Sequence, residues 1–246
     1  MAETKEKLIK SIGYNQHQLI NDMLYMHNDN KGIDVDITYS SGKFYGTFKQ
    51  NNGEKFTIEQ PKHCFDIEPQ FDYVKKIEPW GKIPLDDKSV DSIMIDLPFV
   101  CAPKNSKSIK ENKKGSNIIF KRFASYYPIG ELYASYNHWL NEAFRILKDG
   151  GKCFFKCQNT ISGSKYYCTE EYSWLAAQEI GFYVLDRFTL LAKSRLISGK
   201  IKKQQHARNF SSVFWVFEKN GKFKPIVYNE LKDNYLKKLL ENDENK

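Results

Sequence analysis

The second half of the chain alternates between helix and strand patterns and then ends in two strand patterns that only a loop separates. Residues 130–147 and 169–181 predict amphipathic helices, and residues 152–158 and 182–193 predict strands. The last strand, 211–219, follows without a helix, and a parallel neighbour would need a crossover connection. We therefore expect an α/β fold of the doubly wound type, with a mostly parallel sheet, an antiparallel last strand and helices on both faces.

The first half predicts shorter elements in front of this pattern. Residues 14–27 predict a helix, and residues 43–58 predict a β-hairpin around an Asn-Asn-Gly turn. Strands are expected near 32–36, at the stretch that ends in Asp66, and at 90–95. The chain of 246 residues suits one main domain, 29–220, with an N-terminal helical segment (1–28) packed on it and a C-terminal helix and tail (221–246).

Composition limits the classes of function. The net charge of +8 and a pI near 9.0 favour a polyanionic partner. The five cysteines form no CxxC pair, so we expect reduced core thiols and no metal site. The first residues lack an apolar signal core, and no apolar run reaches transmembrane length, so we expect a soluble, cytoplasmic protein that has no contact with a membrane.

Asp96 occupies a position that suits a functional acid. It follows the apolar strand pattern of residues 92–95, and Pro98 stops the strand because proline has no N–H to donate. Ligands bind at the carboxyl ends of strands in open α/β sheets. An acid that caps a turn is the alternative for an isolated Asp-x-Pro.

Three motifs carry a resemblance to a known family. Residues 96–99 read Asp-Leu-Pro-Phe, residues 142–151 read E-x-x-R-x-L-K-x-G-G, and residues 205–208 (Gln-His-Ala-Arg) precede the strand Phe-Trp-Val-Phe at 214–217. In this order they resemble the S-adenosylmethionine-dependent amino-methyltransferases of adenine N6 or cytosine N4 in DNA, especially small stand-alone proteins of bacteria and phages. The resemblance covers about residues 30–219 and implies a Rossmann-like class I methyltransferase fold.

The resemblance assigns the chemistry to residues 96–99, whose counterparts in the family read Asp/Asn/Ser-Pro-Pro-Tyr/Phe/Trp. There the first side chain and the carbonyl of the second residue accept hydrogen bonds from the target amine, and the fourth residue stacks on the extruded base. Leu97 replaces a proline but keeps the carbonyl. The expected catalytic residues are therefore Asp96, Leu97, Pro98 and Phe99.

The resemblance also implies S-adenosylmethionine as the cofactor. The family carries a glycine-rich loop after its first strand, and residues 36–42 stand in that place with Gly42 as the surviving glycine. An acid at the end of the second strand suits the ribose hydroxyls. Residues 78–84 stand where the family often has an acid with neighbours that hold the adenine, and a surface turn is the alternative there. The expected cofactor residues are Asp36, Thr38, Tyr39, Ser40 and Gly42 in the loop, and Asp66, Glu78 and Trp80 beyond it.

Two basic segments, residues 101–122 and 193–208, follow the carboxyl ends of strands at the predicted active-site edge. They suit phosphate contacts, although a solvated surface is the alternative for each. The expected nucleic-acid contacts are Lys104, Lys107, Lys110, Lys113, Lys114, Arg122, Lys200, Lys202, Lys203 and Arg208. Lys156 is a weaker candidate for the pocket, and His206 suits a structural hydrogen bond.

The favoured target is adenine N6 in DNA, and two alternatives stay open. Ribosomal-RNA adenine dimethyltransferases carry a tetrapeptide that is closer to residues 96–99, which favours RNA as the substrate. The glycine-poor loop instead favours an inactive relative that binds nucleic acid or a protein partner. Because the chain has no evident target-recognition domain, a protein partner is a further candidate as the source of target choice.

Overall fold

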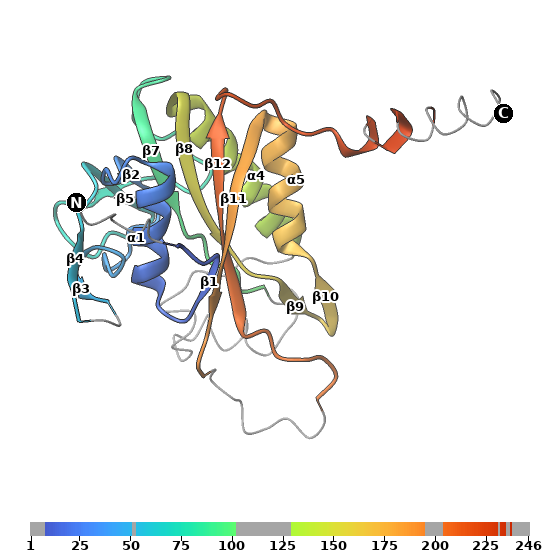
Figure 1. The fold of residues 1–246 in the computed structure, drawn as a ribbon, viewed down its shortest axis with the longest axis horizontal. Helices are drawn as coiled ribbons and strands as arrows, with labels where there is room; N and C mark the ends of the chain where they lie inside the picture. Colours follow the sequence, from blue (N-terminus) through green and yellow to red (C-terminus); the bar gives the residue numbers. More distant parts are fainter. Residues whose placement is uncertain are drawn as a thin grey trace, which may run out of the picture.

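The computed structural model describes residues 8–50, 53–101, 129–194, 204–230, 232–234 and 237. Within these residues the centre of the molecule is a sheet in the order β1-β11-β12-β8-β7-β2-β5-β6 (Figure 1). Its strands, in chain order, are β1 (Ile12–Gly13), β2 (Val35–Asp36), β5 (His63–Asp66), β6 (Lys75–Lys76), β7 (Val90–Ile95), β8 (Leu147–Cys157), β11 (Phe182–Leu191) and β12 (Ser211–Lys219).

The strand directions confirm the expectation from the sequence. β12 runs antiparallel to both β8 and β11, between which it lies, and every other pairing in this sheet is parallel. The chain passes outward from β2 to β5 and β6, and then returns to the other side of β2 as β7 and β8. The fold is therefore a Rossmann-like, doubly wound class I methyltransferase fold, and β2 marks the point where the strand order reverses.

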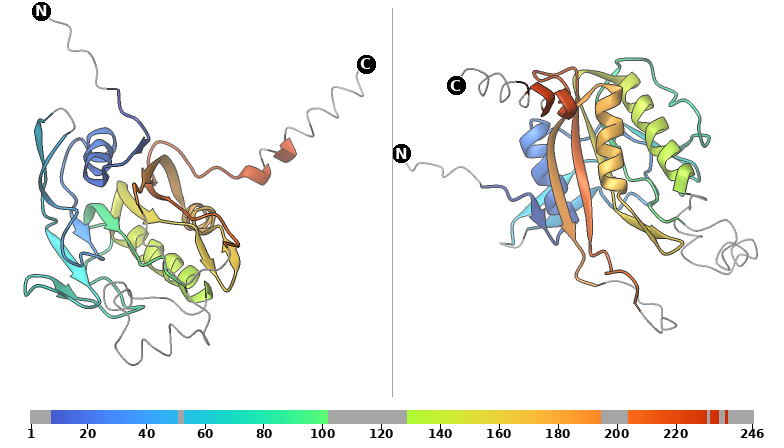
Figure 2. Two further views of the ribbon diagram at one scale, coloured as in Figure 1. Left: turned by 90° about the horizontal axis from the view of Figure 1, so that it is seen from below. Right: turned by 90° about the vertical axis from the view of Figure 1, so that its right-hand side faces the viewer.

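Helices cover both faces of the sheet, as predicted. The helices α4 (Ile129–Ile146) and α5 (Thr169–Ile180) lie on one face, and α1 (Gln16–His27) lies on the other (Figure 2). The hairpin of β3 (Gly46–Lys49) and β4 (Lys55–Ile58) packs beside α1, where it takes the place of a crossover helix between β2 and β5.

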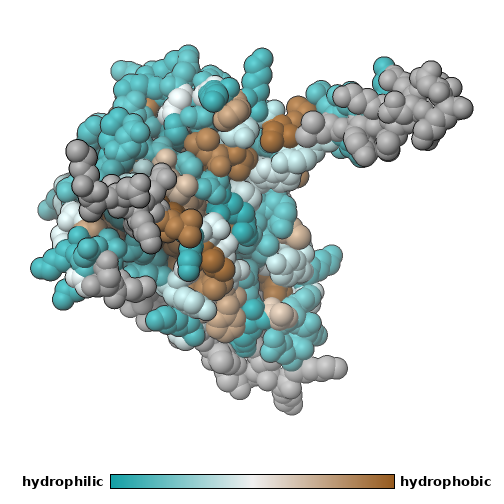
Figure 3. Space-filling view, in the orientation of Figure 1, coloured by the Kyte–Doolittle hydropathy of each residue, from teal (hydrophilic) through white to brown (hydrophobic). Residues whose placement is uncertain are grey.

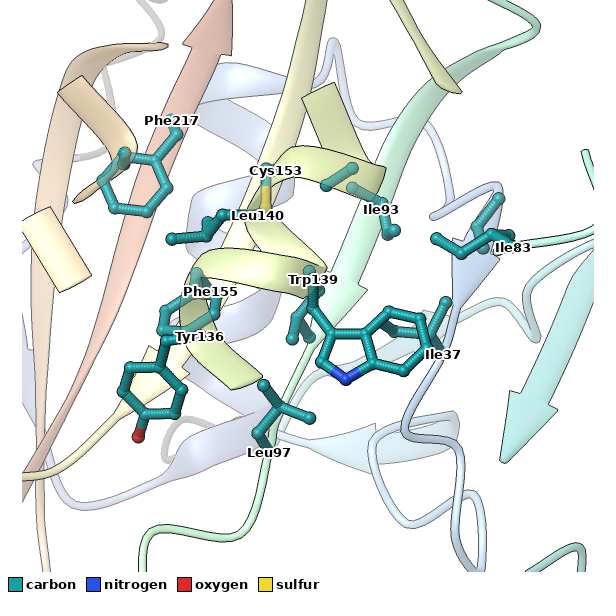
Figure 4. Close-up of a cluster of buried hydrophobic side chains, with 14 of the residues drawn as sticks. Ile37, Ile83, Ile93, Leu97, Tyr136, Trp139, Leu140, Cys153, Phe155 and Phe217 are labelled. Atoms are coloured by element: carbon teal, nitrogen blue, oxygen red, sulfur yellow. The ribbon is translucent and has the colours of Figure 1, made fainter. Parts of the chain in front are cut away.

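Alternation along the central strands explains the two layers of core. Ile93 of β7 and Phe155 of β8 pack under Tyr136 and Leu140 of α4 (Figure 4). Met94 follows Ile93 and Phe154 precedes Phe155, and both point to the opposite face, because successive side chains of a strand alternate. That second core holds Met94, Phe154 and Phe214 from the sheet together with Leu19, Ile20, Met23 and Leu24 from α1.

The end of α4 differs from the sequence prediction. The sequence predicts a helix over residues 130–147 that the following Asp149-Gly-Gly151 would stop, but α4 ends at Ile146 and residues 147–151 already belong to β8. The buried ammonium of Lys219 donates to the carbonyls of Phe144 and Leu147, which satisfies the last turn of the helix without a glycine cap. Gly181, in contrast, ends α5 in the left-handed conformation as predicted.

The structure also describes the five cysteines and part of the C-terminal segment. The cysteines at 64, 101, 153 and 157 are buried and free, whereas Cys168 is exposed. Residues 228–230 and 232–234 are helical, but most of the predicted C-terminal helix lies outside the described residues. A second small hairpin is formed by β9 (Thr160–Ser162) and β10 (Lys165–Tyr167). None of the described helices is long and apolar enough to cross a membrane.

The visible face in Figure 3 is mainly hydrophilic. Apolar side chains gather between α1 and β11 and at the start of the C-terminal segment (Figure 3). Exposed apolar residues include Ile12 of β1, Tyr14 before α1, and Phe223, Ile226 and Val227 in the segment after β12.

Candidate active site

Three aspartates stand at the carboxyl ends of three neighbouring parallel strands. Asp36 is the last residue of β2, Asp66 is the last residue of β5, and Asp96 directly follows β7. β2 pairs with both of the other strands, so the three residues lie along one edge of the sheet. This edge surrounds the strand-order reversal, which is the place where open α/β sheets bind ligands.

Asp36 lies at the centre of this edge and is almost completely buried. Its Oδ1 accepts hydrogen bonds from the backbone N–H and the hydroxyl of Thr38, at 2.7 and 3.0 Å, and its Oδ2 accepts the hydroxyl of Tyr45 at 2.6 Å. Burial raises the pKa of Asp36 to about 7, and the negative charge of Asp96 adds to the increase. Its contacts make Asp36 a support for the surrounding loop.

Thr38 connects the ends of β2 and β7. Its hydroxyl accepts the backbone N–H of Asp96 at 2.8 Å while it donates to Asp36. The predicted lining residue Thr38 therefore also fixes the backbone at the start of the Asp-Leu-Pro-Phe segment.

The carboxylate of Asp96 forms an ion pair with Lys156 of β8. The distance from Lys156 Nζ to Asp96 Oδ2 is 2.9 Å, and the side chains are 11% and 22% exposed, respectively. The ammonium lies 5.3 Å from the ring centre of Phe44 and 5.5 Å from that of Phe214. The register of β7 against β8 explains this contact. The two strands are parallel and Ile95 pairs with Phe155, so the residues that follow them, Asp96 and Lys156, lie side by side.

A pocket of about 450 Å³ is lined by Lys156 of this pair, whereas Asp96 is not among its lining residues. Its lining includes Phe99 and Lys156, so the residue expected to stack on a base and the partner of Asp96 share one cavity. The other lining residues come from the segment before α1 and its first residue, from the end of β11 and the segment after it, and from the start of β12: Tyr14, Gln16, Leu190, Leu191, Ala192, Lys193, Ser194 and Ser212.

The two middle residues of the tetrapeptide lie differently from Phe99. Leu97 is buried at 3% exposure and packs in the cluster that holds Trp139 of α4 (Figure 4). Pro98 is partly exposed. The buried leucine side chain anchors the segment in the core under α4.

The loop after β2 is held by tyrosine packing. Tyr39 is buried, its ring stacks on Tyr45 with centroids 5.5 Å apart, and burial raises its pKa. Gly42 has a φ of +64°, and a Cβ there would lie 2.5 Å from the hydroxyl of Tyr39. The hydroxyl of Tyr39 therefore occupies the space that a side chain at position 42 would fill.

Asp66 connects this loop to β5. Its Oδ2 accepts the backbone N–H of Ser40 at 2.8 Å, and its Oδ1 accepts that of Glu68 at the same distance. Burial raises the pKa of this carboxyl group above its usual value. Each carboxylate oxygen has a second lone pair, so Asp66 can accept further hydrogen bonds from hydroxyl groups.

Glu78 and Trp80 lie in a turn after β6, at the same edge of the sheet. The N–H of Gly81 donates to the carbonyl of Glu78 at 2.8 Å, and Glu78 forms an exposed ion pair with Lys76. Trp80 has a φ of +63°, which is unusual for a bulky residue, and half of it is exposed. Its ring meets His138 of α4 edge-on, with the centroids 5.8 Å apart.

Most of the expected nucleic-acid contacts fall outside the described residues: Lys104, Lys107, Lys110, Lys113, Lys114, Arg122, Lys200, Lys202 and Lys203. Arg208 is described and lines a second cavity, of about 330 Å³, beside the β9–β10 hairpin. His206 forms a hydrogen bond with the carbonyl of Ser164 in the same place, at 2.9 Å, in agreement with a structural role.

No protein-family model matches the chain, and no curated protein does either. Solved structures with some likeness include TTHA0409 of Thermus thermophilus, described as a DNA modification methylase and complexed with S-adenosyl-L-methionine. The identity is 12%, the TM-score is 0.32, and the match covers 58% of this chain and 53% of that one. The chain thus spans about half the length of that protein.

Two other solved structures match more of the chain. One belongs to the complex between the Haloferax volcanii Trm112 methyltransferase activator and a methyltransferase, with 14% identity, a TM-score of 0.40, and coverage of 82% of this chain and 93% of that one. The other is the [4+2]-cyclase SpnF, with 10% identity, a TM-score of 0.42, and coverage of 81% and 80%.

Proposed function

We propose that the protein is an S-adenosylmethionine-dependent methyltransferase that acts on the exocyclic amine of a nucleic-acid base, with adenine N6 in DNA as the favoured target. The observation that carries the proposal is the placement of Asp96. Its carboxylate stands at the strand-order reversal, paired with Lys156, and that lysine lines a pocket together with Phe99. An aromatic ring that lines the pocket and a carboxylate acceptor paired with another lining residue suit an aromatic amine.

The residues around β2 and β5 fit the cofactor in part. Asp66 keeps acceptor capacity for the ribose hydroxyls, and Glu78 and Trp80 follow the next strand, where they would contact the adenine. Gly42 does not fit close contact with the methionine portion, because Tyr39 fills the space beside it. S-adenosylmethionine supplies an electrophilic methyl group, and the electron pair of its C–S bond stays on sulfur when the methyl leaves.

Asp96 and Leu97 would prepare the nitrogen for this methyl group. The lone pair of an exocyclic amine is delocalised into the ring, so acceptors on its hydrogens favour a tetrahedral nitrogen with a localised pair. The Asp96 carboxylate and the Leu97 carbonyl are those acceptors, and Phe99 holds the base by stacking. The nitrogen forms the new N–C bond with its lone pair and then releases one proton, through the Asp96 carboxylate, to solvent.

The cavity and the charge of the chain favour a nucleic-acid substrate. A volume of about 450 Å³ lies in the usual range of ligand pockets, roughly 300–1,000 Å³, and a base must leave its stack to enter such a site. The excess of eight positive charges suits phosphate binding. DNA is favoured over RNA by the motif order, and a protein partner would supply the choice of target sequence.

Two measurements test the proposal. Calorimetry with S-adenosylmethionine tests the cofactor, and tritiated methyl transfer to unmethylated DNA and to RNA, side by side, tests the substrate. We expect binding of the cofactor and transfer to DNA. Transfer to RNA alone would establish the RNA alternative, and a protein that binds nucleic acid without binding the cofactor would establish the inactive relative.

The variant Asp96→Ala tests the assigned acceptor. It should lose methyl transfer and keep its affinity for the cofactor. Asp91→Ala is the matched control, because Asp91 lies at the other end of β7, where its exposed side chain pairs with Lys148 at the surface. A fully active Asp96→Ala protein would refute the mechanism.

A further inference from the structure

We propose that Lys156 is a positioning residue of this site: it binds one oxygen of Asp96 and leaves the other for the target amine. This inference rests on the proposed function and adds a residue to it. Lys156 Nζ donates to Asp96 Oδ2 at 2.9 Å, and within the described residues no donor reaches Oδ1. A carboxylate so held presents one free oxygen in one orientation.

The surroundings of Lys156 hold its ammonium in place. Lys156 is 8% exposed, and its Nζ lies over the rings of Phe44 and Phe214. Phe214 is its antiparallel partner on β12, and Phe44 comes from the loop after β2. A cation over two aromatic faces is attracted to both, so few positions of the flexible side chain remain favourable.

Asp96 is held from two sides. Lys156 Nζ donates to its Oδ2 at 2.9 Å, and its backbone N–H donates to the hydroxyl of Thr38 at 2.8 Å. The ammonium of Lys156 thus sets the orientation of a carboxylate whose backbone is already fixed by Thr38.

Lys156→Met in the full-length protein provides the main test. Methionine fills similar space without charge, so we expect kcat for methyl transfer to fall about 100-fold, as misplacement of a reacting group does. The KM for DNA and the dissociation constant of S-adenosylmethionine should change little. Lys156→Arg, which keeps a donor cation, should retain more activity than Lys156→Met.

Lys152→Met is the matched control on the same strand. Lys152 forms an equally short, mostly buried ion pair with Glu218, at 2.8 Å, but it does not line the pocket. A purely structural effect of losing a buried lysine would appear in both variants, so we expect Lys152→Met to keep the wild-type kcat. Equal losses of kcat in the two variants would overturn the positioning role.

A double variant tests the coupling to Asp96. Asp96→Asn supplies a neutral acceptor that needs no cation, so adding Lys156→Met to it should cause no further loss of kcat. An equal loss in both backgrounds would overturn the inference. Absence of methyl transfer by the wild-type protein would overturn the proposed function and this inference together, whereas a wild-type kcat in Lys156→Met would overturn only the role of Lys156.

Discussion

The hydroxyl of Thr38 accepts the backbone N–H of Asp96 at 2.8 Å, and the same hydroxyl donates to Asp36 at 3.0 Å. One side chain thus satisfies a polar group on each of two strand ends. We expect Thr38→Val, which keeps the shape but loses the hydroxyl, to lower the free energy of unfolding by about 1–3 kcal/mol. Urea denaturation measures this change. Thr38→Ser is the control and should stay close to the wild type, so equal stability of the two variants would contradict the bridge.

The raised pKa of Asp36 predicts a distinctive dependence of stability on pH. The native carboxyl group keeps its proton up to about pH 7, whereas in the unfolded chain it releases the proton near 3.8. Between these values the native state binds more protons, so this group's contribution to the free energy of unfolding falls as the pH rises, and it levels off above about pH 7.

The variant Asp36→Asn isolates this effect because it cannot titrate. Its free energy of unfolding, relative to that of the wild type, should increase between pH 4 and pH 7 by a few kcal/mol, roughly the size that such a pKa difference implies. Urea denaturation at several pH values measures the difference. Parallel curves for the two proteins would show that Asp36 titrates normally in the fold.

Arg145 explains why the motif E-x-x-R belongs to the fold more than to the chemistry. Its guanidinium pairs with Glu142 at 2.8 Å and donates to the carbonyls of Ile83 and Leu85, so it fastens the segment before β7 to α4. The side chains of Arg145 and Glu142 are only 17% and 14% exposed. Arg145→Met would leave Glu142 without this partner, and we expect a loss of about 3 kcal/mol in the free energy of unfolding.

The exposed pair of Lys88 and Asp149 is the control for this experiment. Its side chains are 60% and 53% exposed, and Lys88→Met should cost about 0–1 kcal/mol. Chemical denaturation of both variants gives the comparison. Equal effects would mean that burial does not strengthen the contribution of Arg145.

The sheet could be predicted from the sequence because alternation of helix and strand patterns is a local signal. The antiparallel β12 followed from a missing helix, and the place of Asp96 followed from a strand that ends before Pro98. Such inferences need only residues that are neighbours in the chain, and the order of parallel strands then brings their ends to one edge.

Contacts between distant segments were harder to predict. Lys156 meets Asp96 across 60 residues of sequence, and only the register of β7 against β8 brings them together. Alternation along the strands offered a partial signal. Met94 and Phe154 belong to the same core, and Asp96 and Lys156 lie two residues after them, so both are expected on the same face of the sheet. The hydrogen bond from Tyr45 to Asp36 had no such signal, since it depends on how an irregular loop folds back.

Gly42 gives a last test, because the sequence suggested a glycine that lets a ligand approach, and the structure places Tyr39 there. Gly42→Ala would put a Cβ 2.5 Å from the Tyr39 hydroxyl at a φ of +64°, so both a clash and backbone strain oppose it. Gly53→Ala is the matched control, since Gly53 also has a positive φ, +89°, but no atom of the described residues lies within 4 Å of the place its Cβ would take. We expect Gly42→Ala to lower the melting temperature clearly more than Gly53→Ala, because only the former displaces a packed ring. Thermal unfolding followed by circular dichroism measures both, and equal decreases would mean that Tyr39 moves aside and that the space beside Gly42 is open to a ligand.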